Sequence, residues 1–341
     1  MPETKTVFSY KPQINISYPS TGRMWLICAC AFACVLQSAL SDGGSSLIVA
    51  LTAVFSAVLT EFLLTRRSCG VQKVKDGSAA ATAMILALML PNQIHPIYVF
   101  FGAAFAIVVV KHSFGGLGSN WLNPALGGWL FIRFSWPSAF ESAHNGFAGS
   151  VSEMAFSSET SAVGANVTDF LNNSVFSIAG VHLPQGYIDL LFFSGNGIIT
   201  DRGLFILLTG TIVITALGIN RGWIPFVFLA VYGFLIRFAG DINGVFWNGD
   251  VLYGIFSGGT IAAAFILAAE PASGAKLKGG VLFTVIFAAV FSWFFRYVGM
   301  EFLGVFIALA LTNSLTPLVR IIEEKYILSR KTFSKLQGNN L

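Results

Sequence analysis

The chain has 341 residues, of which 55% are hydrophobic and only 11% are charged, and its mean hydropathy is +0.73. This composition excludes an ordinary soluble domain and predicts a polytopic protein of the lipid bilayer. The net charge of +4 does not indicate a nucleic-acid partner, because the basic residues form short runs between apolar segments.

Ten apolar segments are long enough to cross or half-cross a bilayer. The first is longer than the hydrophobic region of a signal peptide, so we expect a membrane helix there. The predicted fold class is therefore all-α integral membrane, with about ten transmembrane helices. The segments lie at roughly residues 24–40, 45–65, 78–91, 96–111, 121–136, 203–219, 222–238, 254–270, 279–298 and 300–319.

The positions of the lysines predict the orientation. If the N-terminus is cytoplasmic and each segment crosses, all ten lysines fall on the inner side, and the long loop that ends at residue 201 contains no lysine or arginine. Both termini are thus expected in the cytoplasm. The predicted divisions are an N-terminal membrane half (1–136), an extracytoplasmic loop (137–201), a C-terminal membrane half (202–320) and a cytoplasmic tail (321–341).

A weak internal repeat suggests that the two halves are related. The sequence ATAMILA at 81–87 matches AAAFILA at 262–268 in five of seven positions, and each lies in the third segment of its half. Halves of five segments insert in opposite orientations, which predicts two inverted five-helix repeats. Chance similarity between apolar strings is the alternative.

Several segments carry residues that interrupt helices. The stretch KHSFGGLGSNWLNPALGGWLF (111–131) is rich in glycine, and the segments after KDGS and SGGT are short and end at proline. Irregular backbone at membrane depth must be buried or line a cavity, so we predict broken helices whose N-termini face a central site. Close helix packing is the other interpretation of these glycines. The candidate ligand-binding residues are Gly118, Asn123, Gly258 and Gly259.

Four blocks carry a family resemblance: GGLGSNWLNPALGG, KDGSAAATAMILALMLP, FSGGTIAAAFILAAEPASGAKLKGG and RYVGMEFLGVFIALALTNSLTPL. Together they resemble the D subunit of the Rnf electron-transport complex and the related B subunit of the sodium-translocating NADH:quinone oxidoreductase. The resemblance implies a subunit of a translocase in the prokaryotic inner membrane. Such a complex moves electrons between ferredoxin and a nicotinamide cofactor and couples them to Na⁺ or H⁺ transport, and the subunit is not catalytic alone.

The resemblance also implies flavin, including an FMN joined by a phosphoester to a threonine of the extracytoplasmic loop. Here the loop reads SAVGANVTDF, which places Asn166 at the threonine position, and an amide cannot form that ester. Thr168 is the nearest hydroxyl, two residues away. We therefore expect any flavin, FMN or riboflavin, to be bound noncovalently. A second departure is Asp201-Arg202, where the quinone-reductase relatives have Gly-Glu-Ser/Thr.

Charged residues inside apolar segments need an explanation. Glu61, which is close in sequence to Arg66, is expected to reach the interface with a partner, and ion coupling is the alternative. Glu270 either takes part in an ion or proton path or is an interfacial charge. Arg133 and Arg296 are expected to anchor helix ends. The scattered histidines predict no metal site, the four cysteines are interpreted as structural, and no side-chain set indicates hydrolytic catalysis.

The leading interpretation is a flavin-linked membrane subunit that works with the other subunits of an Rnf-type complex. A transporter or channel is the first alternative, because inverted halves with broken helices also describe solute permeation. A scaffold subunit that assembles the complex without carrying electrons is the second.

Overall fold

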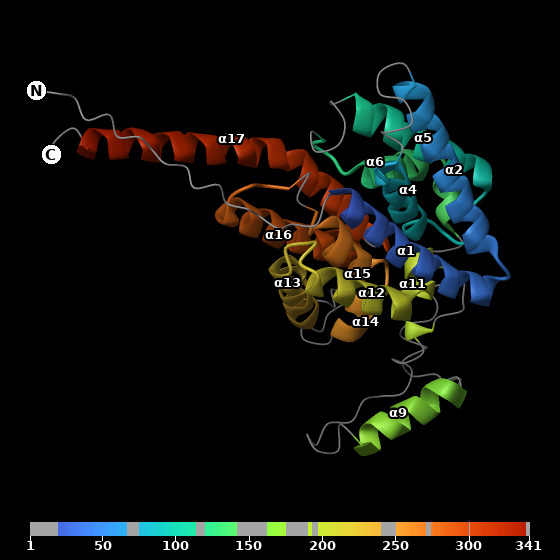
Figure 1. Ribbon diagram of the computed structural model, residues 1–341. Coiled ribbons are helices and arrows are strands. Elements are labelled where there is room, and N and C mark those ends of the chain that lie inside the picture. The colour runs from blue at the N-terminus through green and yellow to red at the C-terminus, as the bar shows by residue number, and fades with distance from the viewer. Residues whose placement is uncertain are drawn as a thin grey trace, which may run out of the picture.

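The computed structural model describes residues 20–66, 75–113, 120–141, 162–174, 190–192, 197–239, 250–270, 274–299 and 301–338. Within these residues the regular secondary structure is helical, apart from one isolated bridge between Pro91 and Ile198 (Figure 1). The all-helical class predicted from composition is thereby confirmed for the described part of the chain.

The N-terminal half has a helix in every apolar segment predicted there. The second segment, predicted at 45–65, is matched in full, because its apolar run is flanked by polar residues at both ends. The elements are α1 (Ser20–Asp42), α2 (Ser45–Thr65), α4 (Ser78–Leu88), α5 (Pro96–Phe105) with the π-helix η1 (Ala106–His112), α6 (Pro124–Ser135) and the 3₁₀ turn η2 (Pro137–Phe140).

The C-terminal half also has a helix in each apolar segment predicted there, and one of these segments is interrupted. The predicted segment 254–270 is not one helix, because the chain leaves helical geometry at Ser257–Gly259. The elements are α11 (Ile199–Arg202), α12 (Leu204–Ala216), α13 (Trp223–Ala239), α14 (Val251–Phe256), α15 (Thr260–Ala262) with the π-helix η4 (Ala263–Leu267), α16 (Lys278–Trp293) with the π-helix η5 (Phe294–Val298), and α17 (Gly304–Gly338). The helix α9 (Ala162–Ser174) belongs to the loop between the halves and lies apart from the helical body in Figure 1.

Four helices are long and apolar enough to span a bilayer by themselves: Thr21–Asp42, Ser45–Thr65, Lys278–Val298 and Gly304–Tyr326. Shorter apolar helices of 10–17 residues accompany them, among them Ser78–Leu88 and Leu204–Ala216. A helix of 11 residues is about 16 Å long, roughly half the hydrocarbon thickness, so α4 reaches only part of the way through.

Both short central helices begin after a glycine in a left-handed conformation. Gly77 precedes α4 with φ of 73°, and Gly259 precedes α15 with φ of 72°. Residues with a Cβ adopt this conformation only at a cost, so glycine allows the chain to turn sharply into each helix. The two sharp bends therefore have the same local cause.

The end of α4 is held by the chain that leads into the second half. The Thr200 hydroxyl donates to the Leu88 carbonyl at 2.6 Å, and the Ile199 N–H donates to the Leu90 carbonyl at 3.0 Å. The Trp129 indole donates to the Met89 carbonyl at 3.1 Å. A helix that ends at membrane depth leaves carbonyls that need partners, and these donors supply them.

Replacement of Gly259 by alanine should destabilise the protein more than the same change at Gly218. Both have positive φ, which costs alanine about 1–2 kcal/mol. A Cβ at Gly259 would also lie 2.4 Å from the Phe306 ring, whereas nothing lies within 4 Å at Gly218. Overpacking adds about 1–3 kcal/mol. Thermal unfolding of both variants in detergent measures the difference, and equal shifts would contradict the proposed packing.

Candidate functional site

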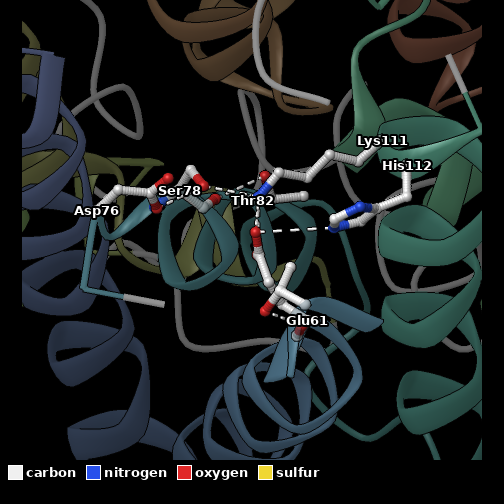
Figure 2. A network of polar contacts seen from close by, with 7 residues as sticks. Glu61, Asp76, Ser78, Thr82, Lys111 and His112 are labelled. Carbon is white, nitrogen blue, oxygen red and sulfur yellow. Dashed lines mark hydrogen bonds and ion pairs between the residues drawn. The ribbon is translucent and has the colours of Figure 1, made fainter. Parts of the chain in front are cut away.

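A buried ion pair holds the start of α4. The Lys111 ammonium, from η1, donates to both carboxylate oxygens of Glu61 at 2.8 and 2.7 Å and to the Ser78 hydroxyl at 2.6 Å (Figure 2). Lys111 and Glu61 are each only 2% exposed. The three protons of the ammonium group are thus all used, as a buried charge requires.

Asp76 and His112 border this cluster. Asp76 accepts both the backbone N–H and the hydroxyl of Ser78, at 2.8 and 2.7 Å, and so caps α4. The His112 Nε2 atom lies 3.8 Å from Glu61 Oε1. The expected interfacial position of Glu61 is therefore wrong, because its carboxylate is buried; the expected partner is present, and it is Lys111, a residue 50 positions away.

The start of α15 is held by Arg296, which lies in η5. Its Nη1 atom donates to the carbonyls of Gly254 and Ser257 at 2.9 and 3.1 Å, and lies 3.2 Å from both the Tyr232 and Thr260 hydroxyls. Its Nη2 atom donates to the Ser257 hydroxyl at 2.5 Å. Arg296 is 8% exposed, so the expectation that it anchors a helix end at the interface is wrong.

Asp201 accepts backbone hydrogen bonds at the start of the same helix, α15. Its two carboxylate oxygens accept the backbone N–H groups of Gly258 and Gly259, each at 3.0 Å. These are the glycines that the sequence pattern assigned to a ligand. A ligand there would have to displace the carboxylate of Asp201.

The starts of α4 and α15 share one construction. In each, a glycine with positive φ precedes a hydroxyl residue, Ser78 or Thr260, at the first helical position. A buried cation from a later π-helix binds that hydroxyl. An aspartate accepts N–H groups at the helix start. π-Helical turns are frequent at functional sites, and here η1 carries Lys111 and η5 carries Arg296.

Asn123 and Glu270, predicted separately, are brought together by the structure. The Asn123 side-chain amide donates to Glu270 Oε2 at 2.5 Å, while its oxygen accepts the Ala125 N–H at 2.8 Å and caps α6. Asn123 belongs to the first half and Glu270 to the second. The pair therefore bridges the halves, and no sequence pattern indicated this contact.

A second bridge between the halves adjoins a pocket of about 250 Å³. Arg133, at the end of α6, donates to Glu301 Oε2 at 2.9 Å, and its guanidinium lies 5.5 Å from the centre of the Phe140 ring. The Arg133 Nε atom is buried and has no hydrogen-bond partner among the described residues. The lining residues are Arg133, Pro137, Phe140, Glu141, Glu301, Phe302 and Leu303.

The remaining predicted site residues lie elsewhere. Thr168 and Asn166, which stands at the family threonine position, are both in α9, where Asn166 is exposed and Thr168 is fully buried. Gly118 lies outside the described residues. No group of three or more His, Cys, Asp or Glu side chains that could hold a metal occurs in the described part.

Basic residues gather where α16 begins. The Arg221 and Arg320 guanidinium groups donate to the carbonyls of Ala275 and Gly274, at 3.3 and 2.8 Å. The pKa of Lys276 is lowered by its partial burial and by the nearby positive charges of Arg320 and Arg221. The negative charge of Glu323 acts in the opposite direction. This cluster lies on the side predicted to be cytoplasmic, where basic residues are expected.

Loss of Lys111 alone should destabilise the chain more than loss of the whole ion pair. Lys111→Met leaves the Glu61 charge buried without its cation, which typically costs about 3–5 kcal/mol. The double variant Glu61→Gln, Lys111→Met removes both charges and should recover much of the lost thermal stability. Unfolding of the two purified variants in detergent tests this, and a double variant no more stable than the single one would refute it.

Comparison with known proteins shows the family of the chain. The sequence profile described as the NQR2, RnfD, RnfE family matches residues 7–328. The chain is 28% identical over 332 residues to the D subunit of the proton-translocating ferredoxin:NAD(+) oxidoreductase complex of Clostridium ljungdahlii, covering 92% of this chain and 94% of that protein.

Two further relatives have similar coverage. The D subunit of the ion-translocating oxidoreductase complex of Shewanella denitrificans is 28% identical, over 90% of this chain and 93% of that protein. The D subunit of the Na(+)-translocating ferredoxin:NAD(+) oxidoreductase complex of Acetobacterium woodii is 24% identical, over 94% of each. Because the family profile covers nearly the whole chain, the protein belongs to the NQR2, RnfD, RnfE family.

Proposed function

We propose that this chain is the D-type membrane subunit of an ion-translocating ferredoxin:NAD⁺ oxidoreductase complex of the prokaryotic inner membrane. The supporting observation is the family match over residues 7–328, with relatives that carry this function in their names. The other subunits of such a complex are its partners, and the chain alone is not the enzyme. Its role is to position cofactors and couple electron flow to Na⁺ or H⁺ movement.

The proposed architecture has ten crossings in two inverted halves, with both termini in the cytoplasm. The order α1, α2, α4, α5–η1, α6 is paralleled by α12, α13, α15–η4, α16–η5, α17. The shared construction at the starts of α4 and α15 supports this pairing, because Ser78 and Thr260 are each the first helical residue after a glycine with positive φ and each contacts a buried cation. Halves with an odd number of crossings point in opposite directions, so the Lys111 cluster faces the cytoplasm and the Arg296 cluster the outside.

We place a noncovalently bound flavin at the Arg133 pocket. The buried Nε atom of Arg133 is a donor that lacks a partner among the described residues, and Phe140 and Phe302 offer ring surfaces. Small-molecule sites typically begin at about 300 Å³, so a pocket of about 250 Å³ suits part of a planar ring system. Flavin, when bound, supplies the one- and two-electron chemistry. The protein orients the ring.

Glu270 is the proposed contact of the coupling ion with this subunit. Its carboxylate is partly buried, lies at the boundary between the halves and is bonded to Asn123. Ionisable residues within membrane proteins commonly mark ion pathways. Its position between the halves lets a small relative movement change its surroundings.

The transporter alternative is less well supported. Solute carriers of this architecture use free N–H groups at broken-helix termini to bind anionic substrates. In this chain Asp76 and Asp201 already accept such N–H groups, and a buried cation holds the start of each of the two helices. The construction favours a fixed scaffold for cofactors over a solute-binding site.

Replacement of Arg133 by methionine should release flavin. A hydrogen bond from a charged donor contributes about 1.5–3 kcal/mol, so affinity should fall at least about tenfold. Arg237→Met is the matched control, because this exposed arginine lies at the end of α13 on the same predicted face. Flavin absorbance of the purified variants provides the measurement.

The same samples distinguish the forms of flavin binding. Noncovalent flavin leaves the chain on denaturation and adds no mass to it. Flavin that stays with the denatured chain would contradict the interpretation of Asn166, and a colourless wild-type chain would favour the scaffold alternative.

A further inference from the structure

The basic residues at the start of α16 come from three separate parts of the chain. Arg221 precedes α13, Arg320 lies in α17, and Lys276 and Lys278 lie where α16 begins. The guanidinium groups of Arg221 and Arg320 donate to the carbonyls of the two residues ahead of Lys276, and both positive charges act on the Lys276 ammonium. We refer to these four residues as the basic cluster.

The basic cluster keeps an excess of positive charge. The negative charge that acts on Lys276 is that of Glu323, which is 7% exposed. Its two carboxylate oxygens accept the backbone N–H groups of Lys276 and Leu277, each at 3.0 Å. One carboxylate does not balance four cations, and the side chains of Lys276 and Lys278 are exposed. The excess charge therefore faces the surroundings of the protein.

The basic cluster lies where membrane helices begin. The candidate span that contains α16 starts at Lys278. The apolar helix α13 starts at Trp223, two residues after Arg221, and the Trp223 side chain is 40% exposed. Tryptophan and basic side chains are both typical of the level of the lipid headgroups. We therefore place the basic cluster at that level.

An exposed apolar stripe continues from the basic cluster along α16. Leu282, Ile286 and Val290 follow Lys278 at intervals of four residues, which places them along one ridge of the helix surface. These three apolar side chains are 43%, 39% and 37% exposed. On a membrane-spanning helix such side chains face lipid tails. A lipid with its tails on this stripe would bring its phosphate group to the basic cluster.

We infer that the basic cluster binds the headgroup of an anionic phospholipid whose tails lie on the apolar stripe of α16. Guanidinium and ammonium groups are strong donors to phosphate oxygens. Basic pockets between membrane helices on the cytoplasmic side commonly bind acidic headgroups. The adjoining stripe favours lipid over free phosphate or an acidic protein, because only lipid would cover both surfaces. The inference goes beyond the proposed function and does not require membership of a complex.

The test measures lipid binding to the full-length chain, purified in mild detergent. Native mass spectrometry follows the bound lipid as dioleoyl phosphatidylglycerol, which is anionic, or dioleoyl phosphatidylcholine, which is zwitterionic, is added. The wild-type chain should bind the anionic lipid at least about tenfold more tightly. The double variant Lys276→Gln, Lys278→Gln should lose at least about tenfold of this preference, because each cation near an anionic lipid contributes about a fivefold factor.

Two further variants serve as controls. Lys276→Arg, Lys278→Arg keeps the charge and should keep the preference. Lys75→Gln, Lys325→Gln removes two exposed lysines from the same predicted face and should also keep it. Lys325 is two residues after Glu323, so it lies on the opposite side of α17 from the contact with α16. Because the result is a ratio between two lipids on one sample, partial unfolding would lower both terms.

Several results would overturn the inference. Equal binding of the two lipids by the wild-type chain is one, and an equal loss of preference in the Lys75, Lys325 variant is another. Displacement of phosphatidylglycerol by free glycerol phosphate would indicate a site for soluble phosphate. An unchanged lipid preference in the Lys276→Gln, Lys278→Gln variant, together with loss of co-purifying subunits, would indicate an acidic protein partner instead.

Discussion

A charge inside a bilayer must be neutralised and hydrogen-bonded by protein, and this requirement governs the centre of the structure. Lys111 and Arg296 are buried within the protein, and each uses its donors to hold the start of a short helix. The helices α4 and α15 begin abruptly at glycines, so their first turns would otherwise lack side-chain partners at a sharp bend. The two cations supply those partners and fix where each helix begins.

The consequence is a pair of rigid helix starts joined by bridges between the halves. Thr200 and Ile199 hold the end of α4, while Asn123 and Arg133 of the first half reach Glu270 and Glu301 of the second. The halves also pack through apolar side chains, because the Trp129 ring lies 5.3 Å from the Phe306 ring and residues of both halves belong to one hydrophobic core. This construction suits a subunit that keeps cofactors at fixed separations and lets an ion change its surroundings.

The sequence predicted the helices well and their side-chain contacts poorly. Hydropathy located α2 to the residue, because a helix in lipid is marked by its apolar run. Lys111 was counted with the loop lysines and Arg296 with the interface anchors, and both are buried. The position of a residue along an apolar segment does not show which side of the helix it lies on. A π-helical turn also changes the direction in which the following side chains point, and it has no sequence signature. Asp201 was noticed as a departure from the family, but its contact with Gly258 and Gly259 depends on tertiary structure.

The central claim is that the two broken helices enter the membrane from opposite faces, and sided chemical labelling tests it most directly. All four native cysteines would be replaced by serine, and single cysteines introduced by Lys75→Cys, ahead of α4, and Asp250→Cys, ahead of α14 and α15. A membrane-impermeant maleimide added to intact cells should modify the cysteine at 250 and reach the one at 75 only after permeabilisation. Labelling of both positions from the same side would contradict the inverted arrangement.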